Sequence, residues 1–104
     1  MHIVMNRFKV TEGQEEVFEE VWRNRESYLN EVPGFLSFKM LKGDVKEGLR
    51  LYSSHVEWEN KSDFENWVQS DAFKKSHGKR EGKQKMPSGV IAGHPQIEVF
   101  EVIL

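Results

Sequence analysis

The chain has 104 residues, of which 38% are hydrophobic and 31% are charged, and its net charge at pH 7 is −2. This composition is that of one ordinary globular domain covering residues 1–104, and neither of a disordered tail nor of a strongly basic nucleic-acid-binding protein. Because the chain has no cysteine, disulfides, iron–sulfur clusters and thiol catalysis are excluded, and a metal would need His or carboxylate ligands. No apolar run approaches the ~20 residues that span a bilayer, and no leader pattern opens the chain, so we expect a cytoplasmic protein without a membrane partner.

The first predicted element is a strand over residues 2–10, where side chains alternate between two faces. The more apolar face carries Val4, Asn6, Phe8 and Val10. Asn6 is therefore an amide among core residues, which costs about 1–3 kcal/mol if it lacks hydrogen-bond partners. From the sequence alone, an Asn satisfied by neighbouring backbone is preferred to an Asn that contacts a ligand.

A helix follows, with Thr11 and Gln14 in the spacing of a capping box. Acidic side chains occupy its outer face, and Trp22 lies within its apolar stripe, which predicts a core role for that residue. The stripe consists of Val17, Phe18, Val21, Trp22, Tyr28 and Leu29. Residues 32–34, Val-Pro-Gly, end the helix.

Residues 35–41 and 49–58 read as two strands, and the two-glycine segment 42–48 between them suits a hairpin. Neither face of the second strand is uniformly apolar. His55 lies on that strand without a second His or a carboxylate at metal-ligand spacing, so a structural or surface role is expected for it.

A second helix is predicted from Ser62, which forms an S-x-x-E capping box with Glu65. Trp67 lies on the apolar seam of this helix. Ser70 is expected to interrupt the helix and re-aim the chain before it reaches His77. The interruption would let Trp67 and His77 approach one ligand, although a straight helix would point them in different directions.

The segment 79–95 is rich in charge, glycine and proline. Loops of this length in compact domains are usually functional lids or disordered. Residues 96–104 alternate cleanly and predict the last strand.

The order strand, helix, strand, strand, helix, strand predicts an α+β, ferredoxin-like βαββαβ fold, with both helices on one face of an antiparallel sheet. The other face of the sheet would then need a partner. Because apolar residues occupy both faces of the first and last strands, we expect a homodimer that packs sheet on sheet into an α+β barrel.

In this topology the first strand is central, so a planar ligand between the second helix and the sheet would touch Asn6 on one side and His77 on the other. His is the common neutral axial ligand of haem iron. Basic side chains able to neutralise propionates surround His77, namely Lys74, Lys75, Lys79, Arg80, Lys83 and Lys85. On the residues alone, a solvated histidine at a helix end is the preferred interpretation of His77.

Three features together resemble the IsdG-type haem-degrading monooxygenases of the antibiotic-biosynthesis monooxygenase (ABM) superfamily. They are Asn6 in the first strand, the Val-Pro-Gly-Phe turn at 32–35, and the run from Trp58 to Gly78. The resemblance covers nearly the whole chain. Its most specific part is the joint occurrence of Asn6, Trp67 and His77.

The resemblance implies that haem is both cofactor and substrate. His77 would bind the haem iron axially, Asn6 would donate a hydrogen bond on the opposite side, and Trp67 would press against the porphyrin and keep it ruffled. The ring would be opened with O2 and iron released. The electrons would come from an external donor, a reductase, because the chain has no flavin, nicotinamide or P-loop motif.

Two alternatives remain open at this point. A cofactor-independent ABM-type monooxygenase acting on a quinol or phenolic substrate would use the same cavity and would not need His77. A non-catalytic haem-binding protein would use the same binding residues without turnover. An RNA-binding ferredoxin-like domain is disfavoured, because the net charge is acidic and the candidate aromatic residues Phe8 and Phe38 suit a core.

Overall fold

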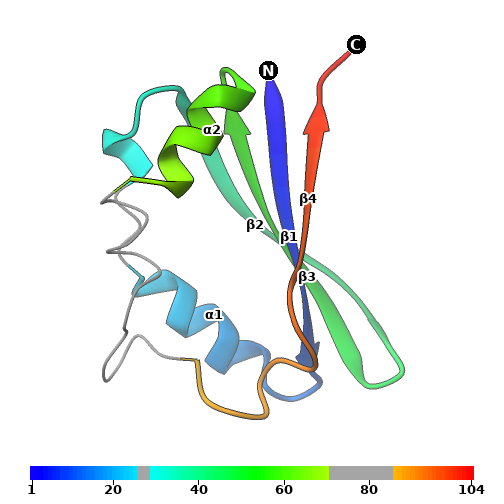
Figure 1. Ribbon diagram of the computed structural model, residues 1–104. Helices are drawn as coiled ribbons and strands as arrows, with labels where there is room; N and C mark the ends of the chain where they lie inside the picture. Colours follow the sequence, from blue (N-terminus) through cyan, green and yellow to red (C-terminus); the bar gives the residue numbers. More distant parts are fainter. Residues whose placement is uncertain (26–28, 71–85) are drawn as a thin grey trace.

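The structure is a computed structural model that describes residues 1–25, 29–70 and 86–104. Its elements are β1 (His2–Thr11), α1 (Glu15–Arg23), a 3-10 turn η1 (Leu29–Glu31), β2 (Phe35–Lys46), β3 (Leu49–Trp58), α2 (Lys61–Val68) and β4 (Gln96–Glu101). The strands form one antiparallel sheet in the order β2-β3-β1-β4. Both helices lie on the same side of this sheet (Figure 1). The predicted ferredoxin-like α+β arrangement is confirmed.

The central strand β1 pairs with β3 along its whole length and with β4 along its first half. Phe8 contacts Phe18 of α1, with ring centroids 5.3 Å apart, which identifies the helix-covered face of the strand. Because side chains alternate along a strand, Asn6 lies on the same face as Phe8. The predicted position of Asn6 among core residues is thus confirmed.

Helix α1 begins later than predicted, and the expected capping box is wrong. Its N-cap is Gln14, which makes no capping side-chain hydrogen bond. Thr11 instead ends β1, where its backbone N–H donates to Val90 O at 2.9 Å and its hydroxyl donates to Gly89 O at 2.8 Å. This long-range pairing holds Thr11 in the strand, so the residue is not free to cap. The helix also ends earlier than predicted, at Arg23.

The hairpin between β2 and β3 is tighter than predicted. β2 extends to Lys46, and only Glu47 and Gly48 form the turn, with φ of 54° and 78°. Positive φ at both central residues is the type I′ geometry, whose twist matches that of paired strands. The predicted loop 42–48 was therefore wrong in extent, and a register shift between Lys42 and Val45 accommodates the longer pairing. The last strand is also shorter than predicted and ends at Glu101.

The N-terminus of α2 also differs from the prediction. Its N-cap is Asn60 rather than Ser62, and the backbone N–H of Asp63 donates to Asn60 O at 3.2 Å. The helix ends at Val68. Ser70 then donates two hydrogen bonds to Trp67 O, from its backbone N–H at 2.9 Å and from its hydroxyl at 2.6 Å. The predicted end of the helix next to Ser70 is confirmed, and the predicted change of chain direction before His77 lies outside the described residues. No helix within the described ranges is long and apolar enough to cross a membrane.

The described part of the segment predicted as a lid or a disordered loop, residues 86–95, has neither helix nor strand, but its middle is fixed against β1. Val90 is only 2% exposed, Ile91 bridges to Val10, and the N–H of Ala92 donates to Lys9 O at 2.8 Å. The expectation of disorder is thus wrong for residues 90–92, and the lid stays a prediction. The first part of the segment lies outside the described residues.

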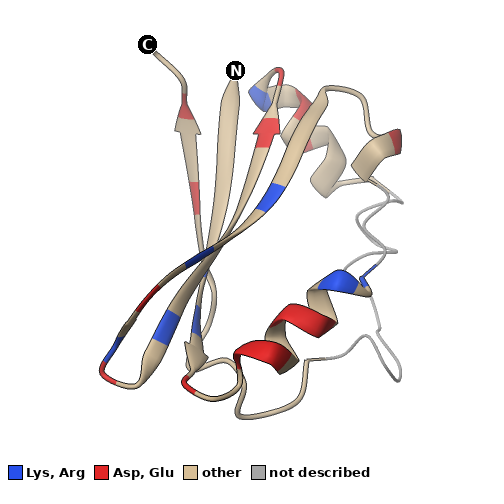
Figure 2. Cartoon of the chain, turned by 180° about the vertical axis from the view of Figure 1, so that it is seen from behind, with Lys and Arg blue, Asp and Glu red and all other residues tan. Residues whose placement is uncertain are grey.

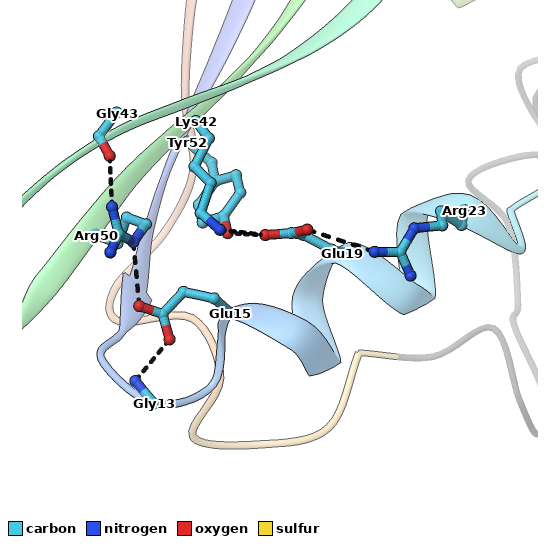
Figure 3. Close-up of polar contacts among 8 residues, drawn as sticks. All are labelled: Gly13, Glu15, Glu19, Arg23, Lys42, Gly43, Arg50 and Tyr52. Carbon is cyan, nitrogen blue, oxygen red and sulfur yellow. Dashed lines mark hydrogen bonds and ion pairs between the residues drawn. The ribbon is translucent and has the colours of Figure 1, made fainter.

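Helix α1 is fixed to the sheet by buried and half-buried polar contacts (Figure 3). The Tyr52 hydroxyl donates to Glu19, which also receives Lys42 Nζ at 2.9 Å. Arg50 Nε lies 3.1 Å from Glu15. The hydrogen bonds from Tyr52 and Lys42 hold the pKa of Glu19 below 4.5, while burial and the Glu19 carboxylate raise the pKa of Tyr52. Figure 2 shows acidic positions in red along α1 and a basic position in blue at its end. Glu15 and Glu16 in the first turn and Arg23 in the last turn complement the helix dipole.

The start of β2 packs closely on the first turn of α2. Gly34 has φ of 83°, and a Cβ built there would lie 2.2 Å from Asp63 Cγ. The N–H of Glu59 donates to Gly34 O at 2.8 Å. Glycine is therefore required at position 34 for two reasons: its backbone is in the left-handed region, and a Cβ there would overlap Asp63.

The Glu19 network predicts a loss of stability in acid. A carboxylate whose folded pKa is lowered stabilises the fold above its unfolded pKa, and this contribution disappears as the pH falls through the folded value. Glu19→Gln should lower the unfolding free energy at neutral pH by about 0.5–1.5 kcal/mol. It should also flatten the decline of that free energy as the pH falls below the ordinary glutamate pKa of about 4.3. Urea unfolding at several pH values measures both. The exposed Glu16→Gln is the control, and an unchanged pH slope in Glu19→Gln would contradict the account.

Gly34→Ala should destabilise the fold more than Gly48→Ala does. Both glycines have positive φ, which costs another residue about 1–2 kcal/mol, but a Cβ at Gly48 meets no atom within 4 Å. Only Gly34→Ala must also displace Asp63. Unfolding free energies from urea titrations compare the two variants, and equal losses would show that the close approach to α2 carries no energetic weight.

Candidate functional site

The apolar core beneath the helices is divided into two clusters by a pair of polar residues. The cluster under α1 consists of Phe8, Val10, Phe18, Tyr52 and Val90. The cluster under α2 and the turn η1 consists of Val4, Leu29, Val56 and Trp58. Between them lie Asn6 on β1 and Ser54 on β3, which are direct cross-strand partners. The helix-covered face of the sheet is thus polar at its centre.

A cavity of about 770 Å³ opens over this polar pair. Its volume falls in the range of small-molecule and cofactor sites. Its floor is formed by Phe38, Ser54, Val56, Val4, Asn6, Ile97 and Val99 from all four strands. Its walls are Trp22, Arg25 and Leu29 on the side of α1 and Phe64, Glu65, Trp67, Val68 and Gln69 on the side of α2.

The two floor residues have unused hydrogen-bonding groups. Asn6 is half-buried, Ser54 is only 7% exposed, and neither side chain makes a hydrogen bond to any residue that the structure describes. The expectation that neighbouring backbone satisfies Asn6 is therefore not met within those residues. Both side chains line the cavity, so a ligand there can use their hydrogen-bonding groups.

Trp67 forms much of the wall on the side of α2. Its ring lies 5.6 Å from that of Trp58 and 6.3 Å from that of Phe64, measured between centroids. It is half-buried and lines the cavity, so it connects the core to the site. The structure thus places Asn6 and Trp67, two of the three predicted site residues, in one cavity.

The third predicted site residue, His77, lies outside the described residues. The same holds for the basic cluster predicted to surround it, Lys74, Lys75, Lys79, Arg80, Lys83 and Lys85. His55 faces the other side of the sheet, where Met5 and Lys39 are its cross-strand neighbours. Among the described residues, no group of three or more His, Asp or Glu side chains is placed to hold a metal ion.

Trp22 and Arg25 form the opposite wall and were not predicted as site residues. Trp22 stacks on Phe38 at 6.1 Å, and the Arg25 guanidinium lies 4.0 Å above the Trp22 ring. The indole N–H of Trp22 is buried and has no hydrogen-bond partner in the described part of the chain. Trp22 lies one helical turn after Phe18, a spacing that the sequence shows, whereas Arg25 lies beyond the end of α1, where helical spacing no longer applies.

The side of the floor nearest β4 is apolar and open to solvent. Ile97 is 61% exposed, Val99 is 43% exposed and Phe38, on the opposite edge strand, is 39% exposed. All three line the cavity. A large apolar ligand would remove this surface from water, which contributes roughly 25 cal/mol for each Å² covered.

Ser54 is the other site residue that the sequence interpretation missed. It shares a strand face with Tyr52, Val56 and Trp58, which are all buried apolar or aromatic side chains. A serine on that face is as anomalous as Asn6 is on β1. The adjacent Ser53 obscured the anomaly by making both faces of the strand look mixed.

The sequence of the chain is similar to those of known proteins. Residues 1–79 match the family described as "Antibiotic biosynthesis monooxygenase". The chain is 33% identical to a "Heme-degrading monooxygenase" of Halalkalibacterium halodurans across 78% of this chain and 69% of that protein. It is 30% identical to a "Heme oxygenase (staphylobilin-producing)" of Staphylococcus saprophyticus across 85% of this chain and 81% of that protein.

Among solved structures, the chain is similar to the heme-degrader MhuD from Mycobacterium tuberculosis, which was solved with two hemes bound in its active site. The TM-score is 0.73 and the sequence identity 27%, across 100% of this chain and 97% of that one.

Proposed function

The chain belongs to the antibiotic biosynthesis monooxygenase family, and from this premise we propose that it is a haem-degrading monooxygenase that binds haem between α1 and α2. One observation carries the proposal: the half-buried amide of Asn6 lies unbonded, within the described residues, on the floor of an apolar cavity of about 770 Å³. The relatives named for haem degradation support the same activity.

The residues of the cavity fit a porphyrin. Trp22 and Trp67 offer aromatic walls, and the exposed Ile97 and Val99 offer an apolar floor to a planar macrocycle. Arg25 is the cationic side chain among the described lining residues, and it suits a carboxylate group of the ligand.

Each site residue has a separate role in this proposal. Haem is the substrate and also supplies the iron and the conjugated ring on which O2 reacts. In this proposal His77 would bind the haem iron, Asn6 would donate a hydrogen bond from its amide to a ligand of the haem, and Trp67 would press against the ring.

The reaction also needs O2 and electrons. The chain contains no G-x-G-x-x-G or P-loop sequence, so the electrons come from an external reductase. The protein's part is to bind and orient the ring and to limit access of water.

We also propose that the protein is a homodimer. The sheet face that the helices leave uncovered carries exposed apolar side chains, including Leu41 at 40%, Leu51 at 37% and Phe100 at 44% exposed. A second copy packed sheet on sheet would bury them.

Titration with hemin tests the haem proposal. The wild-type protein should give a saturable Soret shift, and reductant with O2 should then convert the haem to an open-chain tetrapyrrole with release of iron, identified by mass spectrometry. His77→Ala should abolish the axial-ligand signature and turnover. Asn6→Ala should retain haem and lose about tenfold in rate, which corresponds to about 1.4 kcal/mol.

His94→Ala and Asn60→Ala are the matched controls, since neither residue lines the cavity. Absence of a saturable Soret shift would reject the proposal. If the protein then oxidised a quinol without haem, the cofactor-independent alternative would hold. Stable bound haem under reductant and O2 would instead identify a haem carrier.

The dimer proposal predicts a mass of two chains at micromolar concentration by light scattering. Leu51→Asp should shift the mass to one chain, because it places a charge in the buried interface. Val17→Asp is the control: Val17 is 38% exposed, close to the 37% of Leu51, but lies in the first turn of α1, where an acid is tolerated. A wild-type monomer would contradict the proposal.

A further inference from the structure

We propose that Ser54 is a positioning residue for Asn6: once haem is bound, the Ser54 hydroxyl would donate a hydrogen bond to Asn6 Oδ1, a bond that the structure described above does not contain, and so direct Asn6 Nδ2 toward a small ligand on the haem iron. This inference rests on the proposed haem-binding function and assigns a role to a residue that the sequence interpretation did not include.

The sheet register brings the two side chains together. Asn6 and Ser54 are direct cross-strand partners on β1 and β3, and both line the cavity. Residues in this relation have Cβ atoms about 4.5–5.5 Å apart on the same face of the sheet. A serine hydroxyl and an asparagine amide are short enough to meet across that gap.

The donor and acceptor groups on the two neighbouring strands then favour one arrangement. A diatomic ligand on iron offers an acceptor atom, so the Asn6 amide must present its Nδ2 donor to it. Asn6 Oδ1 is left as an acceptor in need of a donor. The apolar neighbours on this face, Val4, Val56 and Val99, have none, whereas the Ser54 hydroxyl carries one.

Ser53 is a useful comparison, because it is a buried serine next to Ser54 that cannot reach Asn6. It is 5% exposed, close to the 7% of Ser54, but it lies on the other face of the sheet. Its hydroxyl already donates to Ser54 O at 2.9 Å. The Ser54 hydroxyl has no such bond among the described residues, which leaves it available to Asn6.

Ser54→Thr and Ser54→Val test the inference, since they have nearly the same shape and only Thr keeps the hydroxyl. The hemin-loaded proteins are titrated with cyanide, and the C–O stretch of the carbon monoxide complex is recorded. Ser54→Val should weaken cyanide binding roughly 3- to 10-fold and raise the stretching frequency, because the ligand loses an oriented donor. Ser54→Thr should match wild type, and all readouts are taken at saturating hemin, so that a change in hemin affinity does not enter the comparison.

A double variant separates positioning from direct contact. In an Asn6→Ala background, Ser54→Val should change neither readout further, because Ser54 acts through Asn6. Ser53→Ala should leave both readouts at the wild-type values. A wild-type cyanide affinity and C–O stretch in hemin-loaded Ser54→Val would overturn the role of Ser54 while haem binding stands. A wild-type protein that binds no hemin would overturn both proposals.

Discussion

A polar pair in the middle of an otherwise apolar sheet face determines how this small domain is built. Asn6 and Ser54 lie where the two core clusters would otherwise merge. Covering them with apolar helix side chains would leave their hydrogen-bonding groups unsatisfied, at about 1–3 kcal/mol each. Each helix instead packs on its own cluster at one end of the sheet, and the polar pair faces the cavity between them.

The two walls of the cavity are held by independent contacts. Helix α1 is tied to the sheet through Glu19 and Tyr52, while α2 is held by the close approach of Asp63 to Gly34 and by the packing of Trp67 on Trp58. Neither set of contacts includes the polar pair. The walls therefore stand at a defined separation without the ligand, which lowers the cost of ordering on binding. Stability and ligand binding fall to different residues except at Trp67, which packs on Trp58 and also lines the cavity.

Much of the fold followed from local patterns, because alternation and element order identify strands and helices without knowledge of their partners. Asn6 was found as a polar residue on an apolar strand face. The predicted capping boxes were wrong where long-range contacts decide the local structure. For example, the backbone N–H of Thr11 donates to Val90 O, which keeps Thr11 in β1. Ser54 and Arg25 were missed because their roles depend on strand register and on the approach of α1 to the sheet, which a local pattern does not contain.

The central claim is that haem lies over Asn6 and Ser54, between Trp22 and Trp67. A crystal structure of the oxidised protein with hemin, without reductant, tests it most directly. The account predicts a porphyrin whose one face is turned to the Asn6 amide and whose edge contacts Trp67. A porphyrin bound on the uncovered face of the sheet, or at the far side of α2 from Asn6, would contradict it.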